Sequence, residues 1–308
     1  MKIIVTGGAG FIASHVADAY VSAGHEVVVV DNLSTGRKEN LNSSVPFRLV
    51  DVTDRAKLRK VFLEERPDVI SHHAAQIDVR KSVEDPAFDA RVNIIGIINV
   101  LESARESSAS KVIFSSSGGT IYGECGDTPP AEDALPAPMS PYGISKLSSE
   151  FYLRYYSAQF GIKHTILRYG NVYGPRQDPR GEAGVVAIFV SKILADEECF
   201  IYGDGFQMRD YVYVGDVAAV NLLALSAGDN ETVNIGTGSA ADVNTLFALL
   251  SGHRAGYTKK PAYKPPRKGE LFKSFLDVSK AASALSWKSS TTLSDGLKKT
   301  MDFFKAKK

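Results

Sequence analysis

The first half of the chain alternates short apolar runs with longer stretches whose apolar residues recur at helical spacing. The runs are rich in β-branched residues and end near Gly, Asp or Ser, which is typical of strands. Strands are predicted at residues 2–5, 26–30, 47–50, 69–71, 111–114, 164–168 and 232–235. Helices are predicted between them, at residues 13–23, 55–66, 85–107 and 141–161. Because strands alternate with helices and several strands are apolar throughout, we expect a Rossmann-type, doubly wound parallel sheet in an α/β fold.

The pattern changes after Gly174, where residues 175–181 are polar and rich in loop-forming residues. Later helices are predicted at residues 185–194 and 292–305. We therefore expect a first domain over residues 1–174, to which the chain returns around 209–236, and a smaller C-terminal α/β lobe over residues 175–308.

Composition is ordinary for a globular protein, with 44% hydrophobic and 23% charged residues in a chain of 308. The net charge of +1 gives no electrostatic evidence that the protein binds nucleic acid or a membrane surface. No apolar stretch approaches the roughly 20 residues that span a bilayer, and the N-terminus does not resemble a signal peptide. Two cysteines cannot form a disulfide framework, so we expect a cytoplasmic protein.

A glycine loop separates the first predicted strand from the first predicted helix. Gly7 and Gly10 allow a tight turn and a close approach of a phosphate to the helix N-terminus. Asp31 ends the second predicted strand, where a carboxylate accepts hydrogen bonds from ribose hydroxyls and repels a 2′-phosphate. Ala13 lies at the position where such glycine loops commonly have a third glycine, and alanine is tolerated there. The loop predicts binding of NAD.

Tyr142 and Lys146 lie four residues apart, which places both on one face of a helix. Ser140 and Pro141 suit the cap and the first position of that helix. A nearby cation and a helix N-terminus both favour the phenolate, so Tyr142 could act as a general acid and base on an alcohol. On this pair alone, the alternative of two exposed side chains on an amphipathic helix is favoured.

Three serines, Ser115 to Ser117, follow the predicted strand at 111–114. Ligands of open parallel sheets bind at the carboxyl ends of strands, so these hydroxyls could contact a substrate alcohol and Tyr142. A Ser-rich turn is the alternative. His72 and His73 invite a metal site, but neighbours on a strand point to opposite faces. We expect no metal, with one histidine in the core and His73 near the cofactor.

The sequence resembles the extended short-chain dehydrogenase/reductase superfamily, and most of all the UDP-glucose 4-epimerases. The segments that carry this resemblance are 6–12, 115–117, Tyr142 with Lys146, 168–176 and 203–212. It covers nearly the whole chain and implies NAD as cofactor, a UDP-sugar substrate and epimerisation at C4 through a 4-keto sugar. It makes residues 1–174 the NAD-binding domain and 175–308 mainly the UDP-sugar lobe.

The resemblance also implies roles for single residues. Tyr142 is the catalytic acid and base, Lys146 lowers its pKa, and Ser117, or else Ser116, assists at the substrate hydroxyl. The implied cofactor-binding residues are Gly7, Gly10, Phe11, Ile12, Asp31, Asn32, Ser34, Thr35, Gly36, Asp51, Val52, His73, Ala74, Ala75, Gln76, Asn93, Ser115, Tyr142, Lys146 and Tyr169. The implied substrate-binding residues are Ser117, Gly118, Tyr142, Asn171, Val186, Tyr202, Arg209, Arg267, Glu270 and Ser274. Arg209 and Arg267 would clamp the diphosphate.

Differences between this sequence and related families narrow the range of reactions that the resemblance implies. Related dehydratases and decarboxylases carry an acid after the catalytic hydroxyl, whereas residues 118–121 contain none. An NAD-binding regulator stays an alternative, although it has no need of the intact Ser, Tyr and Lys. The small Ser274, where many relatives carry a bulky aromatic, leaves room for an N-acetyl group. Family members commonly dimerise through the helix of Tyr142 and its neighbour near 93–104, so a homodimer is expected.

Overall fold

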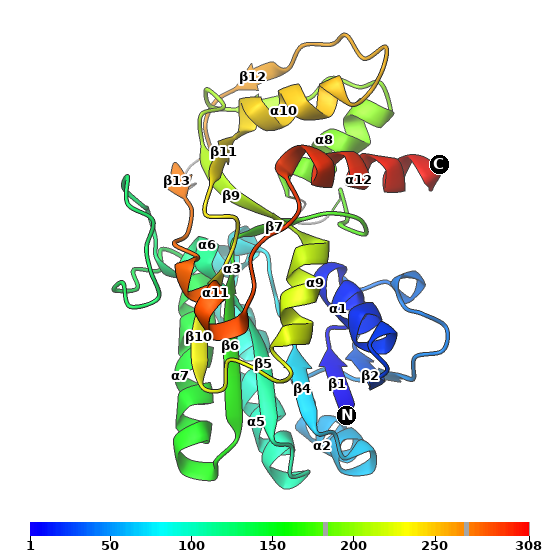
Figure 1. The fold of residues 1–308 in the computed structure, drawn as a ribbon, viewed down its shortest axis with the longest axis vertical. Helices are drawn as coiled ribbons and strands as arrows, with labels where there is room; N and C mark the ends of the chain where they lie inside the picture. The colour runs from blue at the N-terminus through cyan, green and yellow to red at the C-terminus, as the bar shows by residue number, and fades with distance from the viewer. Residues whose placement is uncertain (181–183, 268–270, 308) are drawn as a thin grey trace.

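The computed structural model describes residues 1–180, 184–267 and 271–307, which form a large lobe and a smaller one (Figure 1). The strands of the large lobe are β1 (Lys2–Thr6), β2 (Glu26–Asp31), β3 (Phe47–Leu49), β4 (Val69–His72), β5 (Lys111–Ser117), β6 (Lys163–Tyr169) and β10 (Glu231–Ile235). They pair in parallel in the order β10-β6-β5-β4-β1-β2-β3. This order reverses direction at β1, as in dinucleotide-binding sheets, and the predicted Rossmann-type fold is confirmed.

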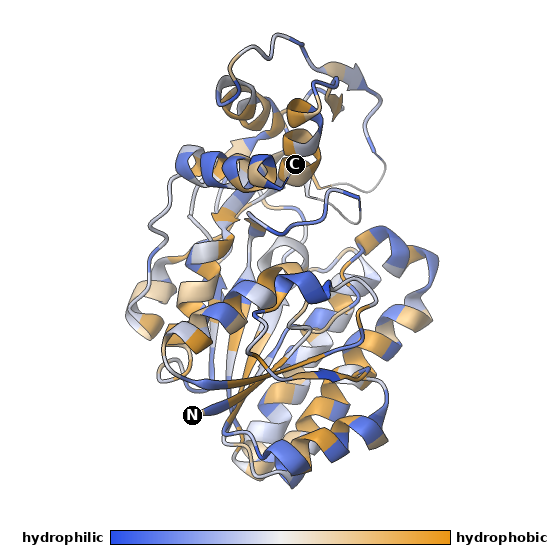
Figure 2. Cartoon of the chain, turned by 90° about the vertical axis from the view of Figure 1, so that its right-hand side faces the viewer, coloured by the Kyte–Doolittle hydropathy of each residue, from blue (hydrophilic) through white to orange (hydrophobic). Residues whose placement is uncertain are grey.

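Helices cover both faces of this sheet. One face carries α1 (Phe11–Ser22), α9 (Val214–Leu223) and α11 (Ser279–Leu285), and the other carries α2 (Arg55–Glu65), α5 (Gly96–Glu106) and α7 (Pro141–Phe160). Along β1, Ile3 and Val5 pack on the first face and Ile4 on the second. Because both faces are covered, the central positions of β1 and β2 are apolar on both sides. Figure 2 shows these hydrophobic strands running between helices that carry hydrophilic segments.

The helix predicted at residues 85–107 is present as one continuous helical stretch over residues 86–106, and it contains a π-helical turn that the sequence pattern did not predict. It consists of α4 (Pro86–Ala90), a π-helical turn (Arg91–Ile95) and α5. Asp85 caps α4 by accepting a hydrogen bond from the Phe88 amide at 2.9 Å. The sequence pattern also missed the longer helices α9, α10 (Val243–Gly252) and α11. It missed three elements of a turn or two each as well, which are η1 (Lys38–Asn40), α3 (Val79–Glu84) and α6 (Gly118–Ile121).

The smaller lobe has its own sheets and its own core. Its strands are β7 (Asn171–Tyr173), β8 (Phe200–Tyr202), β9 (Met208–Tyr213), β11 (Ala240–Asp242), β12 (Ala262–Lys264) and β13 (Lys273–Ser274). β9 pairs with β7, β11 and β13, while β8 pairs with β12. Three helices, α8 (Val185–Leu194), α10 (Val243–Gly252) and α12 (Leu293–Ala306), pack around one apolar cluster beside them.

The chain crosses between the lobes several times after Gly174. β9 belongs to the small lobe, and it leads into α9, which packs against α1 of the large lobe (Figure 1). β10 then forms an edge of the large sheet, and α11 packs against β10. Within the described part of the chain, each helix is too short or too polar to cross a lipid bilayer.

Candidate active site

The glycine loop joins β1 to α1 and touches the end of β4. Gly7 has a φ of +69°, and a Cβ added to it would lie 2.6 Å from the Ala74 backbone nitrogen. The Gly10 amide donates to the Gly7 carbonyl at 2.9 Å, which closes the turn. Among the described residues, no side chain caps α1, whose first turn starts at Phe11 and Ile12. The backbone therefore forms a cradle beside a helix N-terminus, the arrangement that binds phosphate groups.

Asp31 organises the loop after β2. Its carboxylate accepts hydrogen bonds from the Ala9 amide at 3.0 Å and the Leu33 amide at 2.7 Å. Burial raises the pKa of this carboxyl, and the two amides oppose that effect. A Cβ on Gly36 would lie 3.0 Å from both carboxylate oxygens, so the loop wraps closely around Asp31. Ser34 and Thr35 are exposed at its tip.

Asp51 and Asn32 lie side by side beyond Asp31. The Asn32 side chain donates to Asp51 Oδ2 at 2.7 Å, and Thr53 donates to Oδ1 through its amide and its hydroxyl. Although burial acts in the opposite direction, these hydrogen bonds hold the pKa of Asp51 below its usual value. Val52 is buried next to Gly96 at the π-helical turn.

The two histidines lie against aromatic rings, His72 buried at the end of β4 and His73 partly buried just after it. His72 stacks on Phe114, and its Nδ1 lies 2.7 Å from Thr6 Oγ1. His73 stacks on Tyr169. Burial lowers the pKa of both, that of His73 to about 4, so both rings are neutral at neutral pH. Among the described residues, no group of three His, Cys, Asp or Glu side chains is placed to hold a metal ion.

Helix α7 carries Tyr142 and Lys146, and it begins as the sequence predicts. Ser140 caps it by accepting from the Gly143 amide at 3.2 Å, and Pro141 is the first helical residue. A Cβ on Gly143 would lie 2.8 Å from the Thr120 carbonyl oxygen. The absent side chain therefore lets the first turn of α7 approach the segment that follows the serine run.

Lys146 is 3% exposed, so the alternative of an exposed Tyr and Lys pair fails. Its ammonium donates to the Ser115 carbonyl at 2.8 Å and lies 5.8 Å from the centroid of the Tyr142 ring. Burial lowers the pKa of Lys146 to about 8, while the nearby Asp89 and Glu150 act to raise it. The phenol and the ammonium thus lie together at the carboxyl end of β5.

The serine run is the end of β5 itself, because Ser115 to Ser117 pair with Leu167 to Tyr169 of β6. Ser116 is 3% exposed, and its hydroxyl donates to Glu150 Oε1 at 2.6 Å. Ser117 is the last residue of the strand and is partly exposed. Its hydroxyl makes no hydrogen bond with any residue that the structure describes. The Ser116 hydroxyl is therefore held by Glu150 in the protein interior. Ser117 remains the candidate for the hydroxyl that assists at the substrate.

Small and polar residues surround one position just beyond Ser117. A Cβ placed on Gly119 would lie 3.4 Å from Asn171 Oδ1 and 4.0 Å from Ser274 Oγ. Ser274 is buried, and its hydroxyl donates to the Gly119 carbonyl at 3.4 Å. Gly118 has no room for a side chain, since a Cβ there would lie 2.6 Å from Leu276. The predicted sugar contacts Asn171, Gly118 and Ser274 are thus neighbours.

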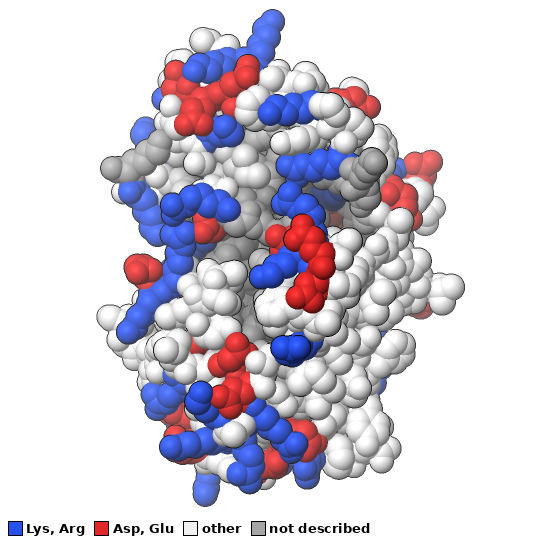
Figure 3. All heavy atoms as spheres, turned by 180° about the vertical axis from the view of Figure 1, so that it is seen from behind, with Lys and Arg blue, Asp and Glu red and all other residues white. Residues whose placement is uncertain are grey.

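The predicted nucleotide anchors lie on β8, β9 and the chain between β12 and β13. Arg209 donates to the carbonyl oxygens of Leu271 at 2.6 Å and Met208 at 2.9 Å. The Arg267 guanidinium lies 3.9 Å from the centroid of the Tyr202 ring, and its hydrogen bond lowers the pKa of Tyr202. On the face drawn in Figure 3, Lys and Arg side chains gather where the lobes meet. Glu270 lies outside the described residues.

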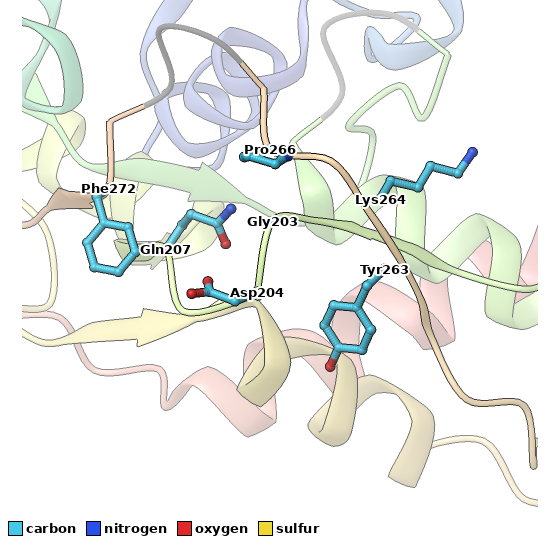
Figure 4. Close-up of a pocket in the computed structure, with 7 residues that line it drawn as sticks. All are labelled: Gly203, Asp204, Gln207, Tyr263, Lys264, Pro266 and Phe272. Atoms are coloured by element: carbon cyan, nitrogen blue, oxygen red, sulfur yellow. The ribbon is translucent and has the colours of Figure 1, made fainter.

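A pocket of about 710 Å³ opens beside these anchors (Figure 4). Its lining residues are Gly203, Asp204, Gln207, Tyr263, Lys264, Pro266 and Phe272. Neither Tyr142 nor Lys146 is among these lining residues, so the pocket is separate from the acid-base pair. Val186, also predicted to contact the substrate, is 1% exposed and packs in the core of the small lobe.

The sequence reasoning missed three residues that act on this site. Asp89 and Glu150 are buried acids that raise the pKa of Lys146. Arg80 of α3 lies close enough to lower the pKa of Tyr202. Glu150 could have been found, because it lies four residues after Lys146 on the same helix face. Arg80 and Asp89 are far from Tyr202 and Lys146 in the sequence, so only the folded structure shows that they lie near the site.

Comparisons with known proteins agree with this geometry. The model of the NAD dependent epimerase/dehydratase family matches residues 3–236. A UDP-glucose 4-epimerase of Mycolicibacterium smegmatis is 42% identical and covers 100% of this chain, which covers 99% of that relative. The structure of a Thermotoga maritima UDP-glucose 4-epimerase with UDP-glucose has a TM-score of 0.97 at 51% identity, with 100% of this chain and 99% of that chain covered.

A Thermus thermophilus UDP-glucose 4-epimerase in complex with NAD has a TM-score of 0.94 at 42% identity, with 99% of each chain covered. The similarity therefore extends over both lobes and includes the glycine loop, the serine run and the Tyr142 helix. With a family model that spans most of the chain and relatives that match its full length, this protein belongs to the NAD dependent epimerase/dehydratase family.

Proposed function

We propose that this protein interconverts UDP-glucose and UDP-galactose by epimerisation at C4 of the sugar, with NAD as its cofactor. The observation that carries the proposal is the buried Lys146 ammonium, which is held on the Ser115 carbonyl beside Tyr142. A lysine whose pKa is lowered and a tyrosine on the same helix face form an acid-base pair for an alcohol. Family membership supports the same activity.

The residues present fit NAD. The cradle at Gly7 has no space for a side chain, and it adjoins the free amides at the start of α1. Asp31 keeps a carboxylate at the end of β2, which suits ribose hydroxyls and disfavours a 2′-phosphate. We assign the adenosine side to the residues around Asp31, Asn32 and Asp51. The nicotinamide side is assigned to Lys146 and the end of β4.

In the proposed reaction, Tyr142 takes the proton of the sugar 4-hydroxyl and later returns it, while the Lys146 ammonium favours the phenolate. Ser117 donates a hydrogen bond to the same oxygen. When bound, NAD supplies the hydride chemistry at C4. Arg209 and Arg267 hold the diphosphate while the 4-keto sugar turns over between the two faces.

The small residues Gly119 and Ser274 support a wider substrate range. Both border the position next to Asn171, and neither carries a bulky side chain. We therefore extend the proposal to UDP-N-acetylglucosamine and UDP-N-acetylgalactosamine. Dehydration and decarboxylation are not proposed, because α6 (Gly118–Ile121) offers no carboxylate next to Ser117.

We also propose that the protein works as a homodimer in the cytoplasm. The apolar residues Ile144, Phe151 and Tyr155 of α7 are 52%, 58% and 53% exposed. They share one helix face, and such a stripe is typical of an interface. The two cysteines, Cys125 and Cys199, are buried free thiols, which suits a reducing compartment.

The test is the assay of UDP-glucose and UDP-N-acetylglucosamine with the wild-type protein and with Tyr142→Phe. We expect the wild-type to form the C4 epimers. Tyr142→Phe should keep its NAD and lose about 100-fold or more in kcat, which is a typical effect of losing a general acid-base group. Tyr152→Phe, further along α7, is the matched control and should keep full activity. Full activity of Tyr142→Phe would refute the role of this phenol.

A further inference from the structure

The loop between α6 and α7 lies beside the chain around β13 and is bonded to it at two places (Figure 1). The Cys125 amide donates to the Lys273 carbonyl at 3.1 Å. Further along both segments, the Asp277 amide donates to the Pro130 carbonyl, also at 3.1 Å. The two contacts lie on either side of Ser274. The reaction scheme above gives this loop no role, although the loop follows directly after the serine run and α6.

Glu124 adds a carboxylate to the first of these contacts. Its Oε2 accepts a hydrogen bond from the Phe272 amide at 2.9 Å, and its Oε1 accepts one from the Lys273 amide at 2.7 Å. Hydrogen bonds to a charged acceptor are stronger than those between neutral groups. Because one planar group binds two successive amides, it fixes the direction of this backbone as well as its position.

The same two residues are also bonded to β9 and to the neighbouring amide of the loop. The Phe272 carbonyl accepts from the Met208 amide at 2.8 Å, while the Lys273 carbonyl is bonded as described above. In the parallel pairing of β13 with β9, Lys273 lies opposite Met208 and Ser274 lies opposite Arg209. Every amide and carbonyl of Phe272 and Lys273 is therefore bonded, and the segment is held between the loop and β9.

The Arg209 guanidinium is held by this segment. Its Nη2 donates to the Leu271 carbonyl at 2.6 Å, and its Nη1 donates to the Phe272 carbonyl at 3.2 Å. An arginine side chain has many rotamers, and two acceptors on one segment select a few of them. Glu124 thus binds the amide of Phe272, and the carbonyl of the same residue binds Arg209.

We propose that Glu124 is a positioning residue for the UDP-sugar: by binding the Phe272 and Lys273 amides, it holds the carbonyl oxygens that orient Arg209 for the diphosphate. The inference rests on the proposed function, which makes Arg209 a diphosphate anchor. Among the described residues, Glu124 makes no hydrogen bond to α7 or β5. Its loss should therefore weaken the binding of the substrate and leave the chemical step unchanged.

Glu124→Gln and Glu124→Ala test this inference in two steps. Glutamine keeps one acceptor oxygen for the two amides, and alanine keeps none. Because Glu124 is exposed, neither change leaves a charge in the interior. KM for UDP-glucose should rise about 10-fold in Glu124→Gln and further in Glu124→Ala, which is the effect of losing about one hydrogen bond to a charged group. kcat should stay within about twofold of the wild-type value.

Asp127→Asn is the matched control. Asp127 belongs to the same loop and pairs with the Lys273 ammonium at 2.8 Å, so it contacts the same segment through a side chain instead of the backbone. It is fully exposed, where an ion pair contributes little. Its KM and kcat should match those of the wild-type. A Glu124→Gln variant with the KM of Asp127→Asn, or with a lower kcat and an unchanged KM, would overturn the proposal.

A binding measurement separates this inference from the proposed function. Calorimetric titration of the NAD-bound proteins with UDP measures how firmly the diphosphate is held, without turnover. UDP should bind about 10-fold more weakly to Glu124→Gln than to Asp127→Asn, and equal affinities would contradict the role of Glu124. A wild-type protein that binds UDP and epimerises no UDP-hexose would defeat the proposed function alone, while the difference between the two variants would still support this role.

The route through Arg209 is tested by a double-mutant cycle. In an Arg209→Ala protein, the carbonyl oxygens held by Glu124 no longer have a guanidinium to orient. Adding Glu124→Gln to Arg209→Ala should therefore weaken UDP binding little further. A Glu124→Gln loss of the same size with and without Arg209 would show that the two residues act independently, and it would overturn the proposal.

Discussion

At the residue scale, the most consequential interaction outside the acid-base pair is the ion pair of Arg168 and Glu150. Both side chains are buried, at 2% and 1% exposure. Arg168 also donates to the Tyr122 hydroxyl at 2.6 Å, and Ser116 donates to the same glutamate. The pair therefore joins β5, β6 and α7 directly behind Ser117 and Lys146. Breaking such a pair leaves a charge in the interior without its partner.

Replacing Arg168 tests this interpretation, because Glu150 has a second, exposed arginine neighbour as a control. Arg168→Met should lower the free energy of unfolding by about 3–5 kcal/mol, the usual cost of an uncompensated buried charge. Arg154 lies 3.9 Å from the same carboxylate and is 48% exposed. Arg154→Met should cost about 1 kcal/mol or less. Denaturant unfolding of the NAD-bound proteins measures both, and equal losses would contradict the prediction.

At the scale of elements, the glycine loop connects three strand ends. The Gly7 amide donates to the Val30 carbonyl of β2 at 2.8 Å, and its α-carbon faces the backbone at Ala74, just after β4. The loop is thus tight for two separate reasons, a left-handed φ and a close backbone approach. Either alone would favour glycine, and together they leave no other residue.

Gly7→Ala and Gly24→Ala separate these two causes. Gly24 lies in the turn between α1 and β2 with a φ of +82°, and a Cβ there would meet nothing within 4 Å. Gly24→Ala should therefore cost about 1 kcal/mol of strain and keep its NAD. Gly7→Ala adds the clash with Ala74, so it should displace the cradle and be purified with little NAD. The NAD content, released by denaturation and read by its absorbance, decides; equal content in both variants would show that the clash is unimportant.

At the scale of the whole molecule, the two lobes share the chain rather than divide it once. α9, β10 and α11 all follow Gly174 and yet complete the large lobe. The loop after β7 also returns to the large lobe, where Arg176 pairs with Asp18 at 2.7 Å and His15 Nε2 lies 2.9 Å from the Pro175 carbonyl. These contacts tie the chain after β7 to α1 of the large lobe.

The proposed homodimer is the prediction that belongs to this scale. Phe151→Glu with Tyr155→Glu places two charges in the exposed stripe of α7, and burying them in an interface is unfavourable. Light scattering over a range of concentrations should give a dimer for the wild-type and a monomer for this variant. Leu223→Glu, at a 38% exposed position of α9, should remain a dimer. A wild-type protein that is monomeric at all concentrations would refute the proposal.

Much of the fold and the first elements of the site could be predicted from the sequence, because their signals are local. The seven strands of the large sheet, the Ser140 cap and the turn at Gly7 each depend on residues close together in the chain. The strands of the small lobe escaped prediction, since most of them have only two or three residues and show no period, and α9, α10 and α11 were not predicted either. The π-helical turn also escaped prediction, because its sequence continues the helical spacing of apolar residues.

The sequence by itself determined the alternating α/β order, the family and the pairing of Tyr142 with Lys146, whose relation needs only one helix. Only the tertiary structure decided that Lys146 is buried and that Ser116 is bound to Glu150. The residues that bury a side chain and interact with its charge lie in segments distant in the chain. No local sequence pattern encodes which of these distant residues will be its neighbours in the fold. The charge state of the acid-base pair is therefore a property of the folded molecule.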